Sequence, residues 1–279
     1  MVENEAFAGI DVGTTTTKAV IINTDKKVLG SFVRRSGTDL ASAAATAFEE
    51  AATRAGVTPN TVQAIVATGY GRKSVPFAHG TKTEIGCHGR GCYHYFPEAI
   101  TVVDIGGQDN KIIKLDAQGR RVGFKMNRKC AAGTGAFLEE IAHKLDISVG
   151  NLNGLAQATG KTAQIGSYCT VFTATEVLDR IRAGEKVDGI VRGLFDSVAK
   201  RILEMDTLTG RVVLSGGVVA FNDIVADLLS ARVGVEVEIA PHPQEMGAFG
   251  AALFAHSAVS NRRVAEKGGF DVGKRSYDV

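Results

Sequence analysis

A repeated segment plan constrains the fold of this chain more than any other feature of its sequence. Residues 6–33 and residues 100–125 each read as a strand, an Asp-x-Gly turn, a second strand, a polar turn and a third strand. In both copies a short apolar run ends in an aspartate, Asp11 or Asp104, shortly before a glycine. This pattern is typical of a strand that enters a tight turn. The duplication predicts an α/β protein made of two similar lobes that face each other across a cleft.

The turn of the first copy suits the phosphates of a nucleotide. Its aspartate would hold Mg²⁺ through water, its lysine would neutralise charge, and its backbone N–H groups and threonine hydroxyls would donate hydrogen bonds. The residues in these roles are Asp11, Gly13, Thr14, Thr15, Thr16, Thr17 and Lys18. The second copy predicts a second phosphate turn after Asp104. A plain hairpin with a threonine-rich turn is the alternative for the first copy taken alone.

A cysteine stands beside a glycine turn in the segment MNRKCAAGTGAFL. Cys130 precedes a Gly-Thr-Gly turn that contains Gly133 and Thr134, and an amphipathic helix follows at once. The N–H groups at a helix start attract anions, and the same field favours thiolate chemistry. Cys169 also lies just ahead of a predicted helix. A buried cysteine beside a helix start is the alternative interpretation.

Other segments fill in the predicted architecture. Gly216 and Gly217 follow a strand at residues 212–214, where a glycine pair lets the backbone approach a ribose or an α-phosphate. Further helices are predicted at residues 39–55, 190–203, 220–231 and 246–255. The tail from Ser260 is polar and basic, which indicates a loosely ordered segment or a docking arm.

The segment EIGCHGRGC reads as an irregular, glycine-rich loop. Cys87 and Cys92 have C-x4-C spacing with His88 between them, but the sequence offers no second close pair of ligands to match them. Structural zinc sites usually have four ligands in two close pairs. We therefore expect a structural or partner-facing loop here rather than a zinc site.

Composition argues against several classes of function. The 32 basic and 30 acidic residues leave a net charge of +2, which gives no support for a nucleic-acid partner or an anionic membrane. No apolar run approaches the ~18 residues of a membrane span. The first residues, MVENEAFAGI, lack the pattern of a signal peptide. The four cysteines favour a reducing, cytoplasmic location, where metal or redox roles are more common than disulfides.

Seven motifs occur in order along residues 7–256, namely GIDVGTTTTKAVI, ATGYGR, EIGCHGRG, VDIGGQD, KCAAGTGAFLE, CTVF and SGGV. Together they resemble the ATPase activators of 2-hydroxyacyl-CoA dehydratases and the ATPase subunits of benzoyl-CoA reductase. Both groups are similar to the actin-like superfamily of sugar kinases and chaperone ATPases, whose duplicated lobes have a ribonuclease H-like fold. The resemblance implies a first lobe at residues 1–95, a second lobe with the cysteine-bearing helices at 96–259, and a basic tail at 260–279.

The resemblance also implies site residues and cofactors. ATP or ADP with Mg²⁺ would bind at the phosphate turns, and the implied catalytic residues are Asp11, Asp104 and Gln108. The implied nucleotide contacts, in addition to those of the first turn and to Gly133 and Thr134, are Gly106, Gly107, Gln108, Asp109, Gly216, Gly217 and Gln244. Cys130 and Cys169 would bind a 4Fe-4S cluster shared across a dimer interface. Because such a cluster needs four thiolates, a second subunit or Cys87 and Cys92 would complete the set.

In the family, ATP hydrolysis drives a low-potential electron into an enzyme that processes an acyl-CoA. The resemblance implies three partners: an acyl-CoA dehydratase or reductase as acceptor, an identical or homologous second ATPase subunit, and ferredoxin or flavodoxin as donor. Family members often have two acidic residues after CTVF, whereas Ala174 and Glu176 stand in these positions here. This departure and the basic tail favour, weakly, the benzoyl-CoA reductase type. A small-molecule kinase and a polymerising actin-like scaffold are the alternatives, although neither has a use for the paired cysteine–helix units.

Overall fold

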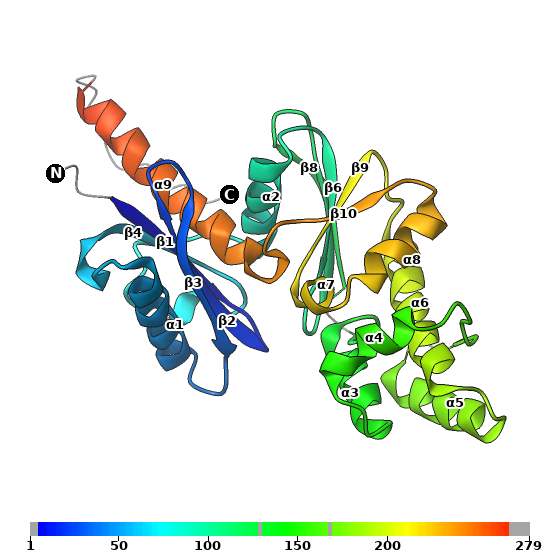
Figure 1. The fold of residues 1–279 in the computed structure, drawn as a ribbon. Coiled ribbons are helices and arrows are strands. Elements are labelled where there is room, and N and C mark those ends of the chain that lie inside the picture. The colour runs from blue at the N-terminus through cyan, green and yellow to red at the C-terminus, as the bar shows by residue number, and fades with distance from the viewer. Residues whose placement is uncertain (1–4, 128–129, 167–168, 268–279) are drawn as a thin grey trace. The chain divides into compact units, whose positions relative to one another are not determined.

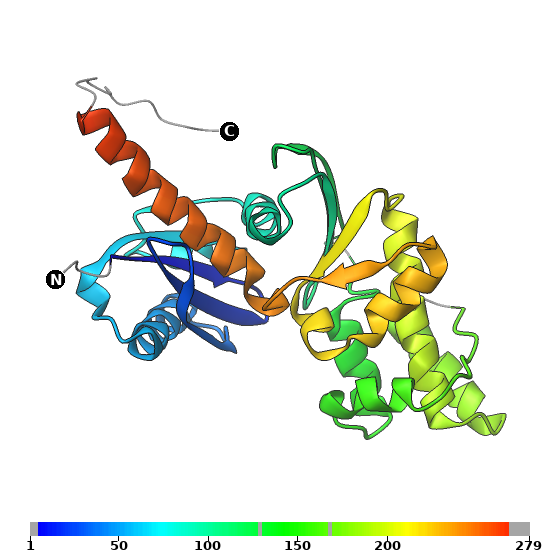
Figure 2. The same ribbon diagram turned by 45° about the horizontal axis from the view of Figure 1, so that its top comes forward.

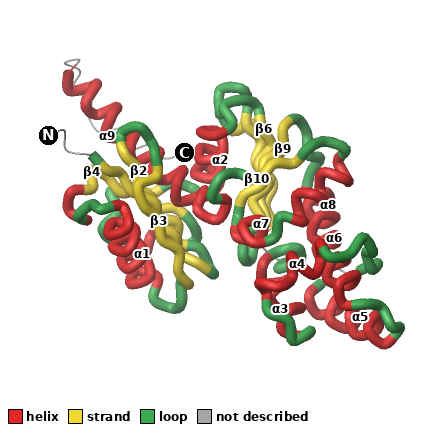
Figure 3. The backbone as a smooth tube through the Cα atoms, viewed as in Figure 1, coloured by secondary structure: helices red, strands yellow, loops and turns green. Residues whose placement is uncertain are grey.

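The computed structural model describes residues 5–127, 130–166 and 169–267. The chain forms two compact units, one from the segment that ends at Cys87 together with the segment from Gly247 onward, and the other from His88 to Met246. Each unit contains one five-stranded sheet, whose strands are yellow in Figure 3. Each unit also has its own hydrophobic core.

The first sheet has the strand order β3-β2-β1-β4-β5. Its strands are β1 (Ala6–Val12), β2 (Thr16–Asn23), β3 (Val28–Arg35), β4 (Val62–Thr68) and β5 (Gly80–Thr81). β2 pairs antiparallel with β1 and β3, whereas β4 runs parallel to β1 and β5. β1 is buried along its whole length, as expected of a central strand that is covered on both faces.

Two long helices pack on the first sheet. α1 (Leu40–Ala55) packs through an alanine-rich face against β1, β2 and β3, and it ends at Gly56 in the left-handed conformation (Figure 1). α9 (Met246–Lys267) lies against β1 in both ribbon views (Figures 1 and 2). Gly9 of β1 permits this approach, since a Cβ there would lie 2.0 Å from the backbone oxygen of Ala248. Two short 3-10 turns, η1 (Pro59–Thr61) and η2 (Arg72–Ser74), flank β4.

The second sheet repeats the topology of the first, with the order β10-β9-β6-β7-β8. Its strands are β6 (Ile100–Ile105), β7 (Asn110–Leu115), β8 (Arg121–Asn127), β9 (Arg211–Ser215) and β10 (Val237–Ile239). β7 pairs antiparallel with β6 and β8, and β9 runs parallel to β6 and β10. The predicted duplication is confirmed, because both sheets have the same strand order and the same strand directions.

The second unit is the more helical of the two. Its helices are α3 (Gly135–Lys144), α4 (Leu152–Gln157), α5 (Thr170–Arg182), α6 (Val187–Met205), α7 (Gly217–Phe221) and α8 (Ile224–Val233), with 3-10 turns η3 (Val149–Asn151) and η4 (Pro243–Glu245). α6 is the buried centre of this group and contacts α4, α5 and α8. α3 contacts α5, which brings together the two helices that follow the predicted cluster cysteines.

The segment predicted as an irregular loop is instead a helix, α2 (Glu84–Tyr95). Glycine disfavours a helix through its conformational freedom, and this local signal led to the wrong prediction. The glycines serve close packing: a Cβ at Gly91 would lie 2.7 Å from the backbone oxygen of Met246, and one at Gly89 would touch the side chain of Leu115. Tertiary contacts therefore override the local propensity.

Two helix boundaries also differ from the prediction. Residues 220–231 were expected to form one helix, but α7 ends at Phe221 and α8 starts at Ile224. α9 continues past Ser260, where a polar tail was expected, as far as Lys267. Within the described residues no helix is both long and apolar enough to cross a membrane.

Candidate functional site

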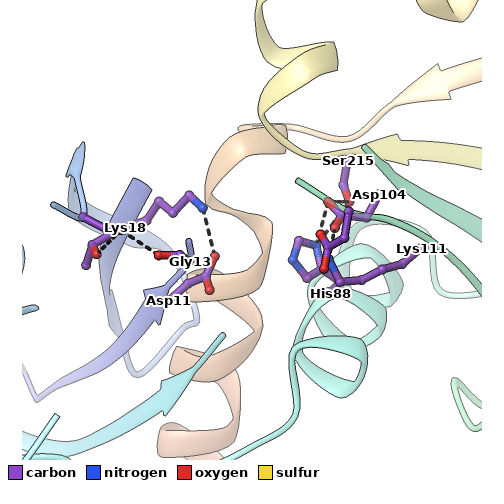
Figure 4. Close-up of polar contacts among 10 residues, drawn as sticks. Asp11, Gly13, Lys18, His88, Asp104, Lys111 and Ser215 are labelled. Atoms are coloured by element: carbon purple, nitrogen blue, oxygen red, sulfur yellow. Dashed lines mark hydrogen bonds and ion pairs between the residues drawn. The ribbon is translucent and has the colours of Figure 1, made fainter. Parts of the chain in front are cut away.

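The first of the two predicted phosphate turns joins β1 to β2. Asp11 and Lys18 are directly opposite each other in this antiparallel pair, and Lys18 Nζ lies 3.2 Å from Asp11 Oδ2 (Figure 4). A hydrogen bond from Gly13 N–H to the Thr16 oxygen, 3.1 Å long, closes the turn. The structure thus brings together the aspartate, glycine and lysine that the sequence predicted as one site.

The threonines of this turn lie in different environments. Thr14 is exposed and the next two are half-buried, whereas Thr17 is fully buried in β2. The Thr17 hydroxyl lies 2.9 Å from the Ser36 hydroxyl, which in turn donates to the backbone oxygen of Gly13 at 2.7 Å. Ser36 was not among the predicted site residues, and it fixes the shape of the turn from the far end of β3.

The second predicted phosphate turn has the same construction. Asp104 and Lys111 are directly opposite in the β6–β7 pair, and Lys111 Nζ lies 3.0 Å from Asp104 Oδ2. Lys111 Nζ also lies 2.7 Å from Asp109 Oδ1. Gly106 N–H donates to the Asp109 oxygen at 2.9 Å, as Gly13 does to Thr16 in the first turn. Lys111 was not among the predicted site residues, although it follows Asp104 at the same spacing at which Lys18 follows Asp11.

Asp104 is the centre of a buried polar cluster (Figure 4). Its Oδ1 accepts a hydrogen bond from the Ser215 hydroxyl at 3.2 Å and lies 3.4 Å from His88 Nδ1. A carboxylate has about four lone-pair directions on its two oxygens, so Asp104 can accept from several donors at once and is oriented by them. Burial raises the pKa of the neighbouring Cys92 thiol, so this cysteine is neutral. Neither His88 nor Ser215 was predicted.

Gly216, Gly217 and Gln244 lie beside this cluster. Gly216 has φ +101°, and a Cβ there would lie 2.3 Å from the Ile105 oxygen, so glycine is required. Its N–H donates to the Pro243 oxygen at 2.9 Å. A Cβ on Gly217 would lie 3.6 Å from the Gln244 side-chain nitrogen. The structure therefore groups three of the predicted nucleotide contacts at the ends of β6 and β9.

The second phosphate turn is hydrogen-bonded to the start of α3. Gly135 N–H donates to the Gly106 oxygen at 2.9 Å, and Ala136 N–H donates to the Gly107 oxygen at 2.8 Å. The N-terminal N–H groups of α3 that would otherwise attract an anion are thus partly engaged by the turn itself. Gln108 is exposed in the same turn. A displacement of this turn would therefore displace the first residues of α3 or break these hydrogen bonds.

The four cysteines fall into two classes. Cys130 is exposed and Cys169 is partly exposed, and Cys169 is the N-cap residue of α5. Cys87 and Cys92 are fully buried in α2. Their burial removes them as candidates for completing a cluster with the two accessible thiols. No group of three or more potential metal ligands is found among the described residues. Cys130 and Cys169 are two accessible thiols, half of the four that a 4Fe-4S cluster needs.

Comparison with known proteins gives a consistent result. The model of the BadF/BadG/BcrA/BcrD ATPase family matches residues 8–255. The activator of lactoyl-CoA dehydratase from Anaerotignum propionicum is 39% identical over 257 residues, which cover 91% of this chain and 98% of that protein. A benzoyl-CoA reductase subunit from Thauera aromatica is 29% identical, over 88% of this chain and 92% of its own. The activators are the more similar, so the weak preference for the benzoyl-CoA reductase type is not supported.

Solved structures agree with this relationship. The (R)-2-hydroxyglutaryl-CoA dehydratase component A from Acidaminococcus fermentans superimposes with a TM-score of 0.87 at 36% identity, over 92% of this chain and 99% of that one. The activator of the 2-hydroxyisocaproyl-CoA dehydratase from Clostridium difficile, with bound ADPNP, also has a TM-score of 0.87, at 33% identity, over 96% of this chain and 100% of that one. A glucokinase of the ROK family from Streptomyces griseus shares the fold at 13% identity, with a TM-score of 0.55 over 90% of this chain and 99% of that one. The predicted family resemblance and actin-like fold are confirmed.

Proposed function

Because the chain belongs to the BadF/BadG/BcrA/BcrD ATPase family, we propose that it is the ATP-hydrolysing activator of a 2-hydroxyacyl-CoA dehydratase. It would use ATP to drive a low-potential electron into that enzyme. The relatives named as dehydratase activators support the choice of partner, and the relative solved with ADPNP supports the choice of nucleotide. An acyl-CoA reductase of the benzoyl-CoA type is the less supported acceptor.

The observation on which this proposal rests is the bonding between the second phosphate turn and α3. Gly106 and Gly107 accept hydrogen bonds from the first two residues of the helix that follows Cys130. A nucleotide-dependent movement of the turn would therefore move the segment that contains an exposed thiol.

The residues of the two turns have defined roles in hydrolysis. Lys18 and Lys111 would neutralise phosphate charge, and the glycine turns would present backbone N–H groups to the phosphate oxygens. Asp11 and Asp104 would each accept a hydrogen bond from a Mg²⁺-bound water. Gln108, exposed at the turn, would orient the attacking water. Catalysis in such a site consists mainly of positioning and charge stabilisation.

Cys130 and Cys169 fit the ligand role because both are accessible thiols. Each precedes a helix, and these two helices, α3 and α5, contact each other. A 4Fe-4S cluster, when bound, would supply one-electron chemistry at low potential. The Ala132 N–H donates to Cys130 Sγ at 3.4 Å, the kind of contact by which a protein tunes such a ligand. A second ATPase subunit, identical or homologous, would supply the other two thiolates, and ferredoxin or flavodoxin would supply the electron.

Replacement of Cys130 by serine tests this function. We expect Cys130→Ser to lose its iron, to hydrolyse ATP within about twofold of the wild-type rate, and to activate no dehydratase, because hydrolysis does not need the thiol whereas the cluster does. Iron and sulfide per chain after anaerobic purification, phosphate release and dehydratase activity measure the three quantities. Cys87→Ala is the matched control, since a buried cysteine acts as a small apolar residue and its loss should leave the iron in place.

Two outcomes would contradict the proposal. The first is a wild-type chain that contains no iron when purified without oxygen. The second is ATP consumption that depends on an alcohol acceptor and yields its phosphate ester, which would establish a small-molecule kinase of the same fold instead.

A further inference from the structure

Two asparagines occupy one cross-strand position at the end of the β7–β8 pair. Asn110 is the first residue of β7, Asn127 is the last residue of β8, and the two are directly opposite each other. Both side-chain amides donate to backbone oxygens of residues 130–134, hereafter the Cys130 loop. Asn127 Nδ2 donates to the Cys130 oxygen at 3.1 Å, and Asn110 Nδ2 donates to the Gly133 oxygen at 3.0 Å. The pair therefore holds the loop at both ends.

The environment of Asn110 indicates that its amide is there for this contact. The residue is fully buried, and its Oδ1 has no hydrogen-bond partner among the described residues. Only the nitrogen end of the amide can face a carbonyl oxygen, so the contact with Gly133 fixes the orientation of the group. A buried acceptor without a partner is unfavourable and rare in native proteins. An apolar residue of the same shape would avoid this cost, so the donor must supply something that packing does not.

The position of Asn110 connects the loop to the phosphate turn. Asn110 follows Asp109, whose oxygen accepts from Gly106 N–H to close that turn. In the β6–β7 ladder it is paired with Ile105, the residue just before the turn. The backbone of Asn110 is thus part of the nucleotide-binding turn, while its side chain is part of the support of the Cys130 loop.

We propose that Asn110 and Asn127 are positioning residues that couple the position of the Cys130 thiol to the conformation of the phosphate turn. Asn127 anchors the start of the loop on the sheet edge. Asn110, the first residue after the turn, holds the end of the loop through its hydrogen bond to the Gly133 oxygen. This contact acts in parallel with the two backbone hydrogen bonds between the turn and the start of α3. With both ends fixed, the Ala132 N–H is aimed at Cys130 Sγ. The inference rests on the proposed function in taking Cys130 as a redox ligand.

The test follows the reactivity of Cys130 in the full-length chain after removal of bound metal by a chelator. Iodoacetamide labels accessible thiols, and peptide mass spectrometry separates Cys130 from Cys169, which serves as an internal reference. In the wild type we expect a non-hydrolysable ATP analogue with Mg²⁺ to change the Cys130 labelling rate by at least about threefold relative to Cys169, since the turn and the loop move together. Asn110→Leu is an isosteric change that removes the donor. In this variant the analogue should still bind, but the labelling rate of Cys130 relative to Cys169 should be about the same with and without it.

Asn222→Leu is the matched control. Asn222 is also buried in the second unit, donates its amide to a backbone oxygen, that of Val218, and has an Oδ1 without a partner among the described atoms. Its replacement should leave the nucleotide response of Cys130 at the wild-type value. Asn127→Leu, at the less buried end, provides a second test if Asn110→Leu does not fold, and it should also abolish the response.

Two results would overturn the inference. One is a wild-type nucleotide response in a folded variant of either asparagine that still binds the analogue. The other is a wild-type chain in which the analogue does not change the labelling rate of Cys130. Neither readout requires iron or a dehydratase, so a failure of this positioning role can be told apart from a failure of the electron-transfer function, which the iron content measures.

Discussion

A single methyl group added at Gly250 should destabilise the first unit. Gly250 lies in α9 where this helix crosses the first turn of α2. A Cβ built on Gly250 would lie 1.8 Å from the backbone oxygen of Cys87 and 2.5 Å from its carbonyl carbon. Both atoms belong to the main chain, so no side-chain rotation can relieve the overlap.

The expected magnitude follows from this geometry. Ordinary contact begins near 3.4 Å, so α9 and α2 would have to separate by about 1.6 Å. Overpacking of this kind costs about 1–3 kcal/mol and sometimes more, and a displaced helix also loses its close fit on Gly9 of β1. Alanine regains about 1 kcal/mol of helix propensity. We expect Gly250→Ala to lose about 2 kcal/mol, the upper end of the overpacking cost less the gain in propensity, which is a substantial part of a stability that is typically about 5–15 kcal/mol.

The assay is urea unfolding with labelling of the Cys87 thiol as the readout. Cys87 is fully buried, so its labelling reports unfolding of this part of the chain rather than surface reactivity. Gly86→Ala is the matched control, because a Cβ there would meet only the Thr83 hydroxyl, at 3.2 Å. The control should unfold within about 1 kcal/mol of the wild type. An unfolding midpoint of Gly250→Ala equal to that of Gly86→Ala would show that close packing of Gly250 on Cys87 does not contribute to stability as expected.

Two charge substitutions give further predictions. Lys111→Met should cost about 3 kcal/mol in thermal unfolding because it leaves the Asp104 carboxylate buried without its cation; Lys18→Met, at the more exposed pair, should cost clearly less, and equal losses would refute the role of burial. Arg211 hydrogen-bonds Glu238 and holds the pKa of that carboxyl below its ordinary 4.5. This contribution to stability is present above that value and is lost as the pH falls through the lowered pKa. Arg211→Leu should therefore have a lower urea midpoint than the wild type near pH 7, and the difference should shrink near pH 3.

The strands that position the two phosphate turns could be predicted from the sequence because their signals are local. An apolar run that ends in Asp-x-Gly placed β1 at residues 6–12 and placed the start of β6 at Ile100. Register is equally local within a hairpin, so the common spacing of aspartate and lysine would have identified Lys111 as well.

Other parts of the site depend on contacts between distant segments. Ser36 reaches the first turn from the end of β3, and His88 and Ser215 reach Asp104 from α2 and β9. Such contacts leave no periodic trace in the sequence. The glycines of α2 led to the wrong prediction of a loop for the same reason, because the helix they permit is stabilised by neighbours such as Met246 rather than by its own composition.

The duplicated turns share a geometry but differ in how firmly they hold their lysines. The Lys18 side chain is 13% exposed and contacts one carboxylate, whereas that of Lys111 is 4% exposed and contacts two. A phosphate that approaches Lys18 competes with a single carboxylate for that lysine. At Lys111 it would have to displace two partners in a less polar environment, where pairing is stronger. We therefore infer that the first turn rearranges when nucleotide binds, and that the second moves as a fixed body that transmits its displacement to α3.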